Sequence, residues 1–435
     1  MLCATTQTKA VIYEKDYSIQ ASNSDIVVAD LEGGAHFDSN TPDKDEHFLK
    51  MVNNDQTALY EEYDLLFHIA RIMSVDVNTH ATQDLFASER VTYINNNEND
   101  LRVFTEDVFG NHKFYLIDDS GAKQLLLATG PKNHIEYSST PEVAAYCNYP
   151  DIVFKLFGTG ATAKFVPPNP DPSTSYYLQG LTQAEAIVCG HNTTRTTPAF
   201  YHFDFATQTT TPIDLSTFPN WEGYWDDMVN GAGRLAIPGN DNVLFYNRAN
   251  GTIEDLITPV IGAKPDNAFI IAKYGGKAVI RTWYQDANQN YINKVLYFDG
   301  TNVADTLPSH NDVWVNGRSN DGKYALLIAN NFDLVLFDVE AGTSQAIYNG
   351  LIRNPMLSPD SSIVVYTAYD TATNETVVNV YDIAAKTTRE LSRKTSMICQ
   401  IYDISKDNST VIIGRDYGIF SINTATGNET FIAYE

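Results

Sequence analysis

Residues 354–366 read NPMLSPDSSIVVY, in which a short polar turn leads directly into a run of β-branched residues. Asp360 and Ser361 are residue types whose side chains bond to nearby backbone or tolerate the conformations of tight turns. Similar stretches occur on both sides: residues 319–328 read SNDGKYALLI and residues 405–413 read SKDNSTVII. A turn that returns at a steady distance indicates an internal repeat.

The first series of turns recurs about every 46 residues, and each copy precedes a short apolar run. The copies between residues 233 and 408 contain Gly, Asp, Asn or Ser, which turns need for positive φ or for side-chain caps. Upstream copies match more weakly. The positions are Glu89, Pro141, Ala184, Gly233, Gly276, Gly322, Ser361 and Asn408.

A second series of turns alternates with the first and recurs about every 44 residues. Its copies follow one apolar run and precede another, as in FDVEAGTSQAI and YDIAAKTTREL, which is typical of a hairpin between two strands. The copy at Gly158 is the weakest. The positions are Asp118, Gly158, Asp204, Asn247, Asp299, Asp338, Asp382 and Asn423.

Two alternating turns divide residues 84–435 into units of four strands each. Repeated four-stranded antiparallel units predict an all-β protein with a β-propeller fold. The turn count favours eight blades, and seven is the alternative because one copy is weak. The abundance of Tyr, Phe and β-branched residues agrees with a sheet protein.

The C-terminal repeats resemble a known family. SPDSSIVVY and the following VNVYDIAAKTTREL are similar to the S-P-D-G…D-x-x-x-G…L repeat of TolB-like propellers, which also occurs in propeller domains of prolyl-oligopeptidase-type enzymes. The resemblance covers residues 309–435 in three copies, with Ser361 and Asn408 in place of the turn glycine. It implies a fold and no particular activity.

Residues 1–83 depart from the repeat and are interpreted as an N-terminal extension of strands and one helix. Strands are expected at Ala10–Tyr13, a candidate for pairing with the last blade, and at Ile26–Ala29. Residues 55–73 carry apolar side chains at helical spacing, which predicts an amphipathic helix. This interaction helix would pack on the propeller or dock on another subunit through Leu59, Tyr63, Leu66, Ala70 and Met73.

The formal net charge of −25 argues against nucleic acid as a partner, because an acidic surface repels phosphates. No apolar run has transmembrane length, and the N-terminus lacks the apolar core of a signal peptide. We therefore expect no membrane insertion and a cytoplasmic or virion-associated location. The four cysteines show no zinc-binding spacing, and three of them stand in predicted strands as small apolar residues.

The stretch FPNWEGYWDDM at residues 218–228 is the leading candidate for ligand binding. Aromatic side chains that alternate with carboxylates could stack on a sugar or perform acid–base chemistry. However, Trp225 and Trp314 each stand eight residues before a turn glycine, and a side chain repeated in register usually packs between blades. The candidate ligand-binding residues are Trp221, Glu222, Tyr224, Trp225, Asp226 and Asp227.

The sequence contains no nucleophile elbow, zinc-protease motif or phosphate-binding loop. Asp286, Asn288 and Asn290 alternate like the start of a calcium loop, but the expected glycine and glutamate are missing. We therefore assign no catalytic residue, no metal site beyond this weak candidate and no cofactor.

Three classes of function remain open. The first is a non-enzymatic scaffold or protein-interaction protein with other protein subunits as partners, and a structural role in an assembly such as a virion belongs to it. The second is a propeller that binds a carbohydrate or small ligand in its central funnel. The third is an enzyme such as a lyase or glycosidase.

Overall fold

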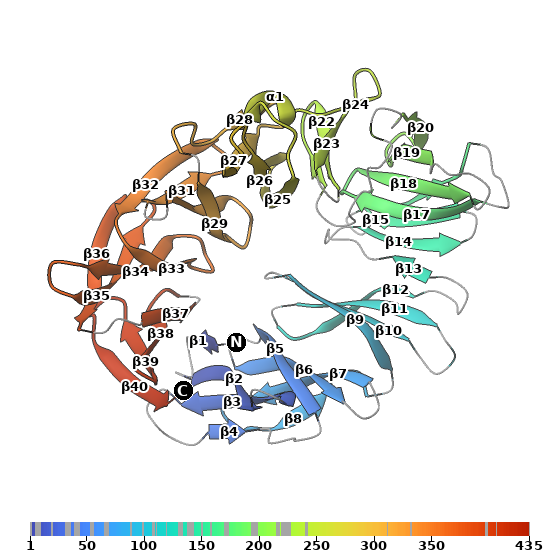
Figure 1. Cartoon of the computed structure of the whole chain (residues 1–435). Helices are drawn as coiled ribbons and strands as arrows, with labels where there is room; N and C mark the ends of the chain where they lie inside the picture. Colours follow the sequence, from blue (N-terminus) through green and yellow to red (C-terminus); the bar gives the residue numbers. More distant parts are fainter. Residues whose placement is uncertain are drawn as a thin grey trace. The chain divides into compact units, whose positions relative to one another are not determined.

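A computed structural model of the chain places most residues between 2 and 434 well enough to describe. The described residues are 2–4, 10–18, 21–30, 36–38, 44–52, 56–64, 69–87, 89–97, 100–106, 109, 111–118, 120–128, 134–136, 143–148, 151–156, 159–168, 174–192, 199–214, 218, 228–239, 242–310, 312–330, 333–395, 399–405 and 407–434. They form strands almost throughout (Figure 1), with one short helix, α1 (Thr258–Ile261).

Strands of the described residues pair into eight four-stranded sheets and one eight-stranded sheet. In each four-stranded sheet the strands follow sequence order and neighbours run antiparallel, so each sheet is a simple meander. Such meanders, repeated along a chain, are the building unit of β-propellers. The chain is therefore an all-β protein of the β-propeller type, as predicted, while the number of blades stays a prediction.

The chain separates into two compact units. One unit comprises Met1–Gly130 with Ile347–Glu435. It contains the sheets β1–β4, β5–β12, β33–β36 and β37–β40. Its strands are β1 (Leu2–Ala4), β2 (Ala10–Ser18), β3 (Ala21–Asp30), β4 (His36–Asp38), β5 (Lys44–Val52), β6 (Thr57–Asp64), β7 (Ile69–Asp76), β8 (Thr82–Asp84), β9 (Arg90–Asn97), β10 (Asp100–Glu106), β11 (His112–Ile117), β12 (Lys123–Ala128), β33 (Ile352–Leu357), β34 (Ile363–Asp370), β35 (Glu375–Asp382), β36 (Thr387–Lys394), β37 (Cys399–Ile404), β38 (Thr410–Arg415), β39 (Gly418–Asn423) and β40 (Glu429–Tyr434).

The other unit comprises Pro131–Ala346 and contains five four-stranded sheets, the last of which ends with β32. Its strands are β13 (His134–Glu136), β14 (Val143–Asn148), β15 (Asp151–Leu156), β16 (Thr162–Phe165), β17 (Thr174–Leu181), β18 (Glu185–Asn192), β19 (Ala199–Asp204), β20 (Thr209–Ile213), β21 (Val229–Asn230), β22 (Arg234–Pro238), β23 (Val243–Asn247), β24 (Thr252–Glu254), β25 (Asn267–Tyr274), β26 (Lys277–Gln285), β27 (Tyr291–Phe298), β28 (Val303–Asp305), β29 (Val313–Arg318), β30 (Tyr324–Ala329), β31 (Asp333–Asp338) and β32 (Thr343–Asn349).

The second series of turns joins the third and fourth strands of successive four-strand sets, from β11–β12 to β39–β40. In all of these turns except the copy at Gly158, an Asp or Asn caps the backbone with its own side chain. Asp338 Oδ1 accepts from the backbone N–H of Ala341 at 2.9 Å, and the Asp338 carbonyl accepts from Gly342 N at 2.8 Å. Gly342 has φ 68°, a left-handed conformation that explains the glycine of the motif.

The first series of turns joins the first and second strands of a sheet at six described positions, and Pro141 lies outside the described residues. The prediction at Glu89 is wrong, because Glu89 directly precedes β9, the first strand of its set. In the stretch that begins the repeat, a buried hydroxyl organises the turn. Ser358 Oγ donates to Asp360 Oδ1 at 2.7 Å and accepts from Ile363 N at 3.1 Å. The same bonds recur around Ser319 and Ser405, and all three hydroxyl residues are fully buried.

The first turns at Gly276, Gly322 and Asn408 also lie close to the preceding sheet. A side chain at Gly322 would overlap the Lys273 carbonyl of β25, and one at Gly276 would stand 2.5 Å from the Asn230 carbonyl of β21. Where Asn408 replaces glycine, its Nδ2 instead donates to Asp360 Oδ2 at 2.9 Å in the preceding sheet. Small or hydrogen-bonding residues are therefore required in this slot because neighbouring backbones meet there.

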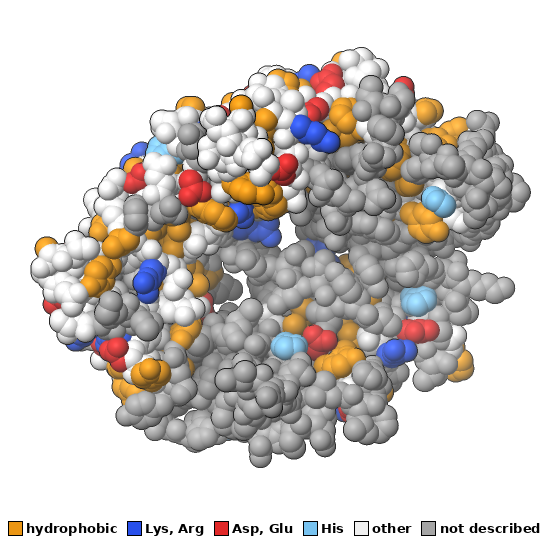
Figure 2. Space-filling view, in the orientation of Figure 1, with side chains coloured by type: hydrophobic (Ala, Val, Ile, Leu, Met, Phe, Trp, Pro, Cys, Tyr) orange, Lys and Arg blue, Asp and Glu red, His pale blue; other side chains and the backbone are white. Residues whose placement is uncertain are grey.

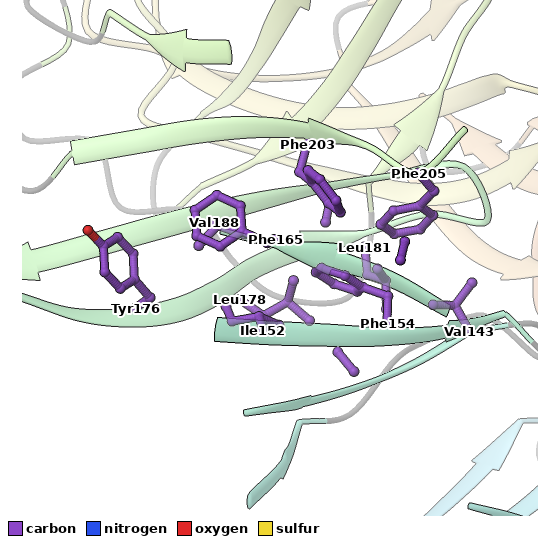
Figure 3. Packing of buried hydrophobic residues seen from close by; sticks show 13 residues of the cluster. Val143, Ile152, Phe154, Phe165, Tyr176, Leu178, Leu181, Val188, Phe203 and Phe205 are labelled. Carbon is purple, nitrogen blue, oxygen red and sulfur yellow. The ribbon is translucent and has the colours of Figure 1, made fainter. Parts of the chain in front are cut away.

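Apolar side chains fill the layers between successive sheets. Figure 3 shows one such layer, in which Phe154 and Phe165 of β15 and β16 face Phe203 and Phe205 from the next sheet. The ring centroids of Phe154 and Phe205 are 4.8 Å apart. Each fully buried ring of this kind contributes about 1.5–3 kcal/mol relative to exposure, so these layers supply much of the stability.

The predicted interaction helix is wrong. Leu59 and Tyr63 lie in β6, Ala70 and Met73 lie in β7, and Leu66 lies outside the described residues. β6 pairs antiparallel with β7 and places Tyr63 opposite Ala70, so helical spacing arose from two strands joined by a short connection. The strand conformation is favoured over a helix because it buries Leu59, which is 1% exposed, against neighbouring sheet residues.

The remaining predictions for residues 1–83 fare differently. The expected strands fall in β2 and β3, but β2 is bonded to β1 and β3 on its two edges, which contradicts a closing role for Ala10–Tyr13. The division into residues 1–83 and 84–435 stays a prediction about domains. Residue 83 itself lies within β8, and residues 1–130 belong to one unit.

An unpredicted copy of the second turn lies at Asp76. Asp76 Oδ1 accepts from Thr79 N at 2.7 Å, the Asp76 carbonyl accepts from His80 N at 2.8 Å, and His80 has φ 60°. His80 thus occupies the glycine position of the motif, so the sequence pattern did not reveal this copy. The β5–β8 set therefore has the same turn chemistry as the sets that follow it.

Replacement of Ser361 by glycine should stabilise the protein. Ser361 has φ 61°, a left-handed conformation in which a Cβ atom costs about 1–2 kcal/mol. Glycine avoids this cost, but about half of the gain is lost because glycine gives up more chain entropy on folding. We expect Ser361→Gly to raise the free energy of unfolding by about 0.5–1 kcal/mol, measured by urea denaturation.

Asn408→Gly is the matched variant and should gain less, because it removes the bonds from Asn408 Nδ2 to Asp360 and Ser362. Gly322→Ala should lower stability because of the close Lys273 carbonyl. A loss of stability in Ser361→Gly would contradict the assigned left-handed turn.

Candidate functional site

The residues predicted to bind a ligand, Trp221, Glu222, Tyr224, Trp225, Asp226 and Asp227, lie outside the described residues. Trp314, which shares its repeat position with Trp225, is described. It contacts Arg281 of the preceding sheet, as expected for packing between blades, yet 41% of it remains exposed. Trp314 is thus a partly exposed aromatic side chain in contact with a cation.

Three aromatic rings surround Arg281 in the Pro131–Ala346 unit. Arg281 lies on β26 opposite Phe269 of β25, and Trp283 follows two residues later on the same face. Trp314 comes from β29, the first strand of the next sheet. We call Phe269, Arg281, Trp283 and Trp314 the Arg281 surface.

The guanidinium of Arg281 lies within cation–π distance of all three rings. Its Cζ is 4.5 Å from the ring centroid of Trp314, 5.4 Å from that of Trp283 and 5.7 Å from that of Phe269. Phe269 and Trp283 meet edge to face, with centroids 5.3 Å apart. Such contacts stabilise a cation by about 0.5–2 kcal/mol each but supply no hydrogen-bond acceptor.

Arg281 is half-buried and has no polar partner among the described residues. Its Nε is buried and makes no hydrogen bond, and no described carboxylate forms an ion pair with the guanidinium. Asp312 is the nearby acid, and its Oδ1 accepts from Asn293 Nδ2 at 3.1 Å. Burial lowers the pKa of Arg281 below the ordinary arginine value, with Asp312 acting against this, and the group stays charged at neutral pH.

This arrangement is suited to binding and not to covalent chemistry. A guanidinium donates up to five hydrogen bonds and accepts no proton, so it can hold an anion but cannot act as a general base. The rings offer flat apolar faces beside the charge. In the sequence, the only signal was an arginine inside the strand-like run KAVIRTWY, and Arg281 was not among the predicted site residues.

The Asp286 candidate proves to be a hairpin turn between β26 and β27. Asp286 Oδ1 accepts from the backbone N–H groups of Asn288 and Asn290 at 2.8 and 2.9 Å, and Oδ2 accepts from Asn290 Nδ2 at 3.1 Å. These bonds lower the pKa of Asp286. Its oxygens thus cap the turn, and the Asn290 amide faces them as a donor.

A buried polar cluster joins the sheets β17–β20 and β21–β24. Glu185 accepts hydrogen bonds from His202 Nε2 and from two nitrogens of Arg248, whose Nε lies 3.3 Å from Glu185 Oε2. Arg248 also donates from Nη1 to the Gly231 carbonyl at 2.6 Å. Despite burial, the hydrogen bonds from His202 and Arg248 hold the pKa of Glu185 below its ordinary value.

This cluster contains residue types that catalysis uses, but its groups satisfy one another. Glu185 is 3% exposed and His202 is 8% exposed, so little of either is accessible to a substrate. The cluster therefore acts as a structural connection between two sheets. Cys189 and Cys399 are likewise buried free thiols, as expected, and burial raises the pKa of each to about 11.

Metal-binding clusters and membrane-spanning helices are both absent from the part of the chain that the structure describes. Within those ranges, no group of three or more His, Cys, Asp or Glu side chains could hold a metal ion. No described helix has both the length and the apolar character to span a membrane. On the face shown in Figure 2, described basic and acidic side chains are scattered among apolar ones, without a large basic patch.

No family model and no curated protein sequence matches the chain. Its fold is similar to those of solved propeller proteins. The β-propeller domain of the trilobed protease from Pyrococcus furiosus is 11% identical, with 70% of this chain and 96% of that one covered and a TM-score of 0.34. TolB from Acinetobacter baumannii is 12% identical, with 80% and 79% covered and a TM-score of 0.28.

A crystal structure of a eukaryotic initiation factor is 12% identical, with 99% of this chain and 96% of that one covered and a TM-score of 0.48. Similarity at such low sequence identity speaks to the fold alone, because proteins with unrelated functions share such folds. The TolB-like resemblance noted in residues 309–435 is therefore one of architecture.

Glu185→Gln should destabilise the protein strongly. Removal of one partner from a buried ion pair leaves the other charge uncompensated, at a cost of about 3–5 kcal/mol. We expect a loss of about 3 kcal/mol in the free energy of unfolding, measured by urea denaturation at neutral pH.

The pH dependence supplies a second readout. The folded pKa of Glu185 is lowered, so the unfolded state binds the proton more tightly and stability falls as the pH drops below about 4.3. Glu185→Gln should lose this part of the acid dependence. An unchanged profile would show that the carboxylate is not coupled to folding.

Proposed function

We propose that this chain is a non-enzymatic scaffold or interaction protein of the β-propeller type that binds a partner through the Arg281 surface. The observation that carries the proposal is the charged guanidinium of Arg281, framed by Trp283, Trp314 and Phe269 without a carboxylate partner. Trp and Arg are the side chains that most often dominate the energy of protein interfaces.

Binding is a better reading of these residues than catalysis. Glu185 and His202, the described acid and base in closest contact, are buried and bonded to each other. The Arg281 surface, in contrast, exposes an aromatic ring and holds a cation that cannot exchange protons at neutral pH. Its chemistry supports recognition.

A role in a larger assembly, such as a virion, belongs to the same proposal. The chain would then act through contacts with other protein subunits. If the Arg281 surface joins copies of this chain, mass photometry of the purified protein should show oligomers, and their population should fall in Trp314→Ala. If the partner is a different molecule, the purified protein should be monomeric.

Selection from a displayed random peptide library should test the proposal. Immobilised wild-type protein should enrich peptides that bind, and binding of those peptides should fall about tenfold or more in Arg281→Gln and Trp314→Ala, as expected for interface residues that contribute about 1.4 kcal/mol or more. Direct affinities would be measured by calorimetry.

Arg318→Gln is the matched control. Arg318 lies on β29 like Trp314, carries the same charge as Arg281, and already donates from Nη1 to the Ile271 carbonyl at 2.9 Å. Its loss should leave peptide binding unchanged. If enriched peptides bind all three variants as well as the wild type, or if the protein binds only sugars on a glycan array, the proposed function is wrong.

A further inference from the structure

We infer that the Arg281 surface recognises a carboxylate adjacent to an apolar or aromatic side chain in a peptide segment of the partner. This inference rests on the proposed function and specifies what that partner presents. An Asp or Glu side chain and a C-terminus both supply this carboxylate, because the recognising chemistry is the same.

The unpaired charge of Arg281 is the first argument. The buried Nε has lost its hydrogen bond to water, and a donor removed from water normally has another acceptor. Arg281 has the aromatic rings but no described hydrogen-bond acceptor, and its buried Nε is unsatisfied. A carboxylate completes the site, since its two oxygens match the fork of guanidinium N–H groups.

Burial of the surrounding rings strengthens such a pair. Phe269 and Trp283 are half-buried, and Trp314 covers the guanidinium from the neighbouring sheet. A carboxylate that binds beside these rings leaves water and meets the cation at a lower effective dielectric constant. An apolar side chain next to it would cover the exposed part of Trp314, which adds apolar burial to the ion pair.

The polar groups of the site favour a peptide over an acidic sugar or a phosphate. A sugar needs several hydrogen-bond partners for its hydroxyls, whereas Asn293 and Asp312 at this site are bonded to each other. A phosphate dianion is best held by more than one cation, and the described cation–π contacts here involve Arg281 alone. The single positive charge of Arg281 among three aromatic rings therefore matches one carboxylate with an apolar side chain beside it.

The test uses pairs of peptides that differ in one charge. The peptides acetyl-Gly-Phe-Glu-Gly-amide and acetyl-Gly-Phe-Gln-Gly-amide probe a side-chain carboxylate. Acetyl-Gly-Gly-Phe with a free or an amidated C-terminus probes a terminal carboxylate. Ligand-observed NMR titration of the full chain should show the acid of at least one pair binding about tenfold or more tightly than its neutral partner, the gain expected of a charged hydrogen-bond pair.

Variants at Arg281 decide whether that preference arises at this surface. Arg281→Gln should abolish the difference between acid and neutral peptides, and Arg281→Lys should retain part of it, because lysine keeps the charge but not the planar fork. Arg318→Gln should change nothing. Circular dichroism and thermal melting of each variant would confirm that it is folded.

Several outcomes would overturn the inference. Equal binding of acid and neutral peptides that is lost in Trp314→Ala would keep the interaction surface but refute carboxylate recognition. An acid preference that survives in Arg281→Gln would place recognition elsewhere. Tighter binding of glucuronate than of either acidic peptide would identify an acidic carbohydrate as the occupant and refute the peptide.

Discussion

Close approach between the first turn of one sheet and the backbone of the preceding sheet constrains much of this structure. At Gly322 a side chain would overlap the Lys273 carbonyl, and at Gly276 it would crowd that of Asn230. The turn is held in shape by a fully buried hydroxyl, such as that of Ser319, which bonds both to a neighbouring Asp and to the following strand. Because the backbones can meet there, the sheets stack and their apolar faces close over shared cores.

The Arg281 surface is a consequence of the same stacking. Arg281 and Trp314 belong to different sheets, and only the packing of β29 beside β25 and β27 brings ring and guanidinium to 4.5 Å. The Glu185 cluster arises in the same way between two other sheets, but there each charged group has partners. Two junctions of the same architecture therefore differ. The charged groups of the Glu185 cluster are paired with one another, whereas Arg281 has no described carboxylate partner and lies beside an exposed ring.

Local sequence predicted the turns well and the N-terminal region poorly. The Asp and Gly pattern around Asp338 was readable because turn chemistry depends on residues a few positions apart. At Asp76 the same turn has His80 in the left-handed position, so the copy was missed. The apolar residues between Leu59 and Met73 matched a helix because spacing alone does not distinguish a helix from two strands of a hairpin.

The repeating unit could be read from the chain alone: its strand order, its capped turns and its all-β character follow from interactions among near neighbours. Contacts across sheets could not. The sequence placed Trp314 in a packing position, yet its partner Arg281, the missing carboxylate and its 41% exposure depend on residues far apart along the chain. Local propensity carries no information about such contacts, because they form only when separate sheets pack against each other.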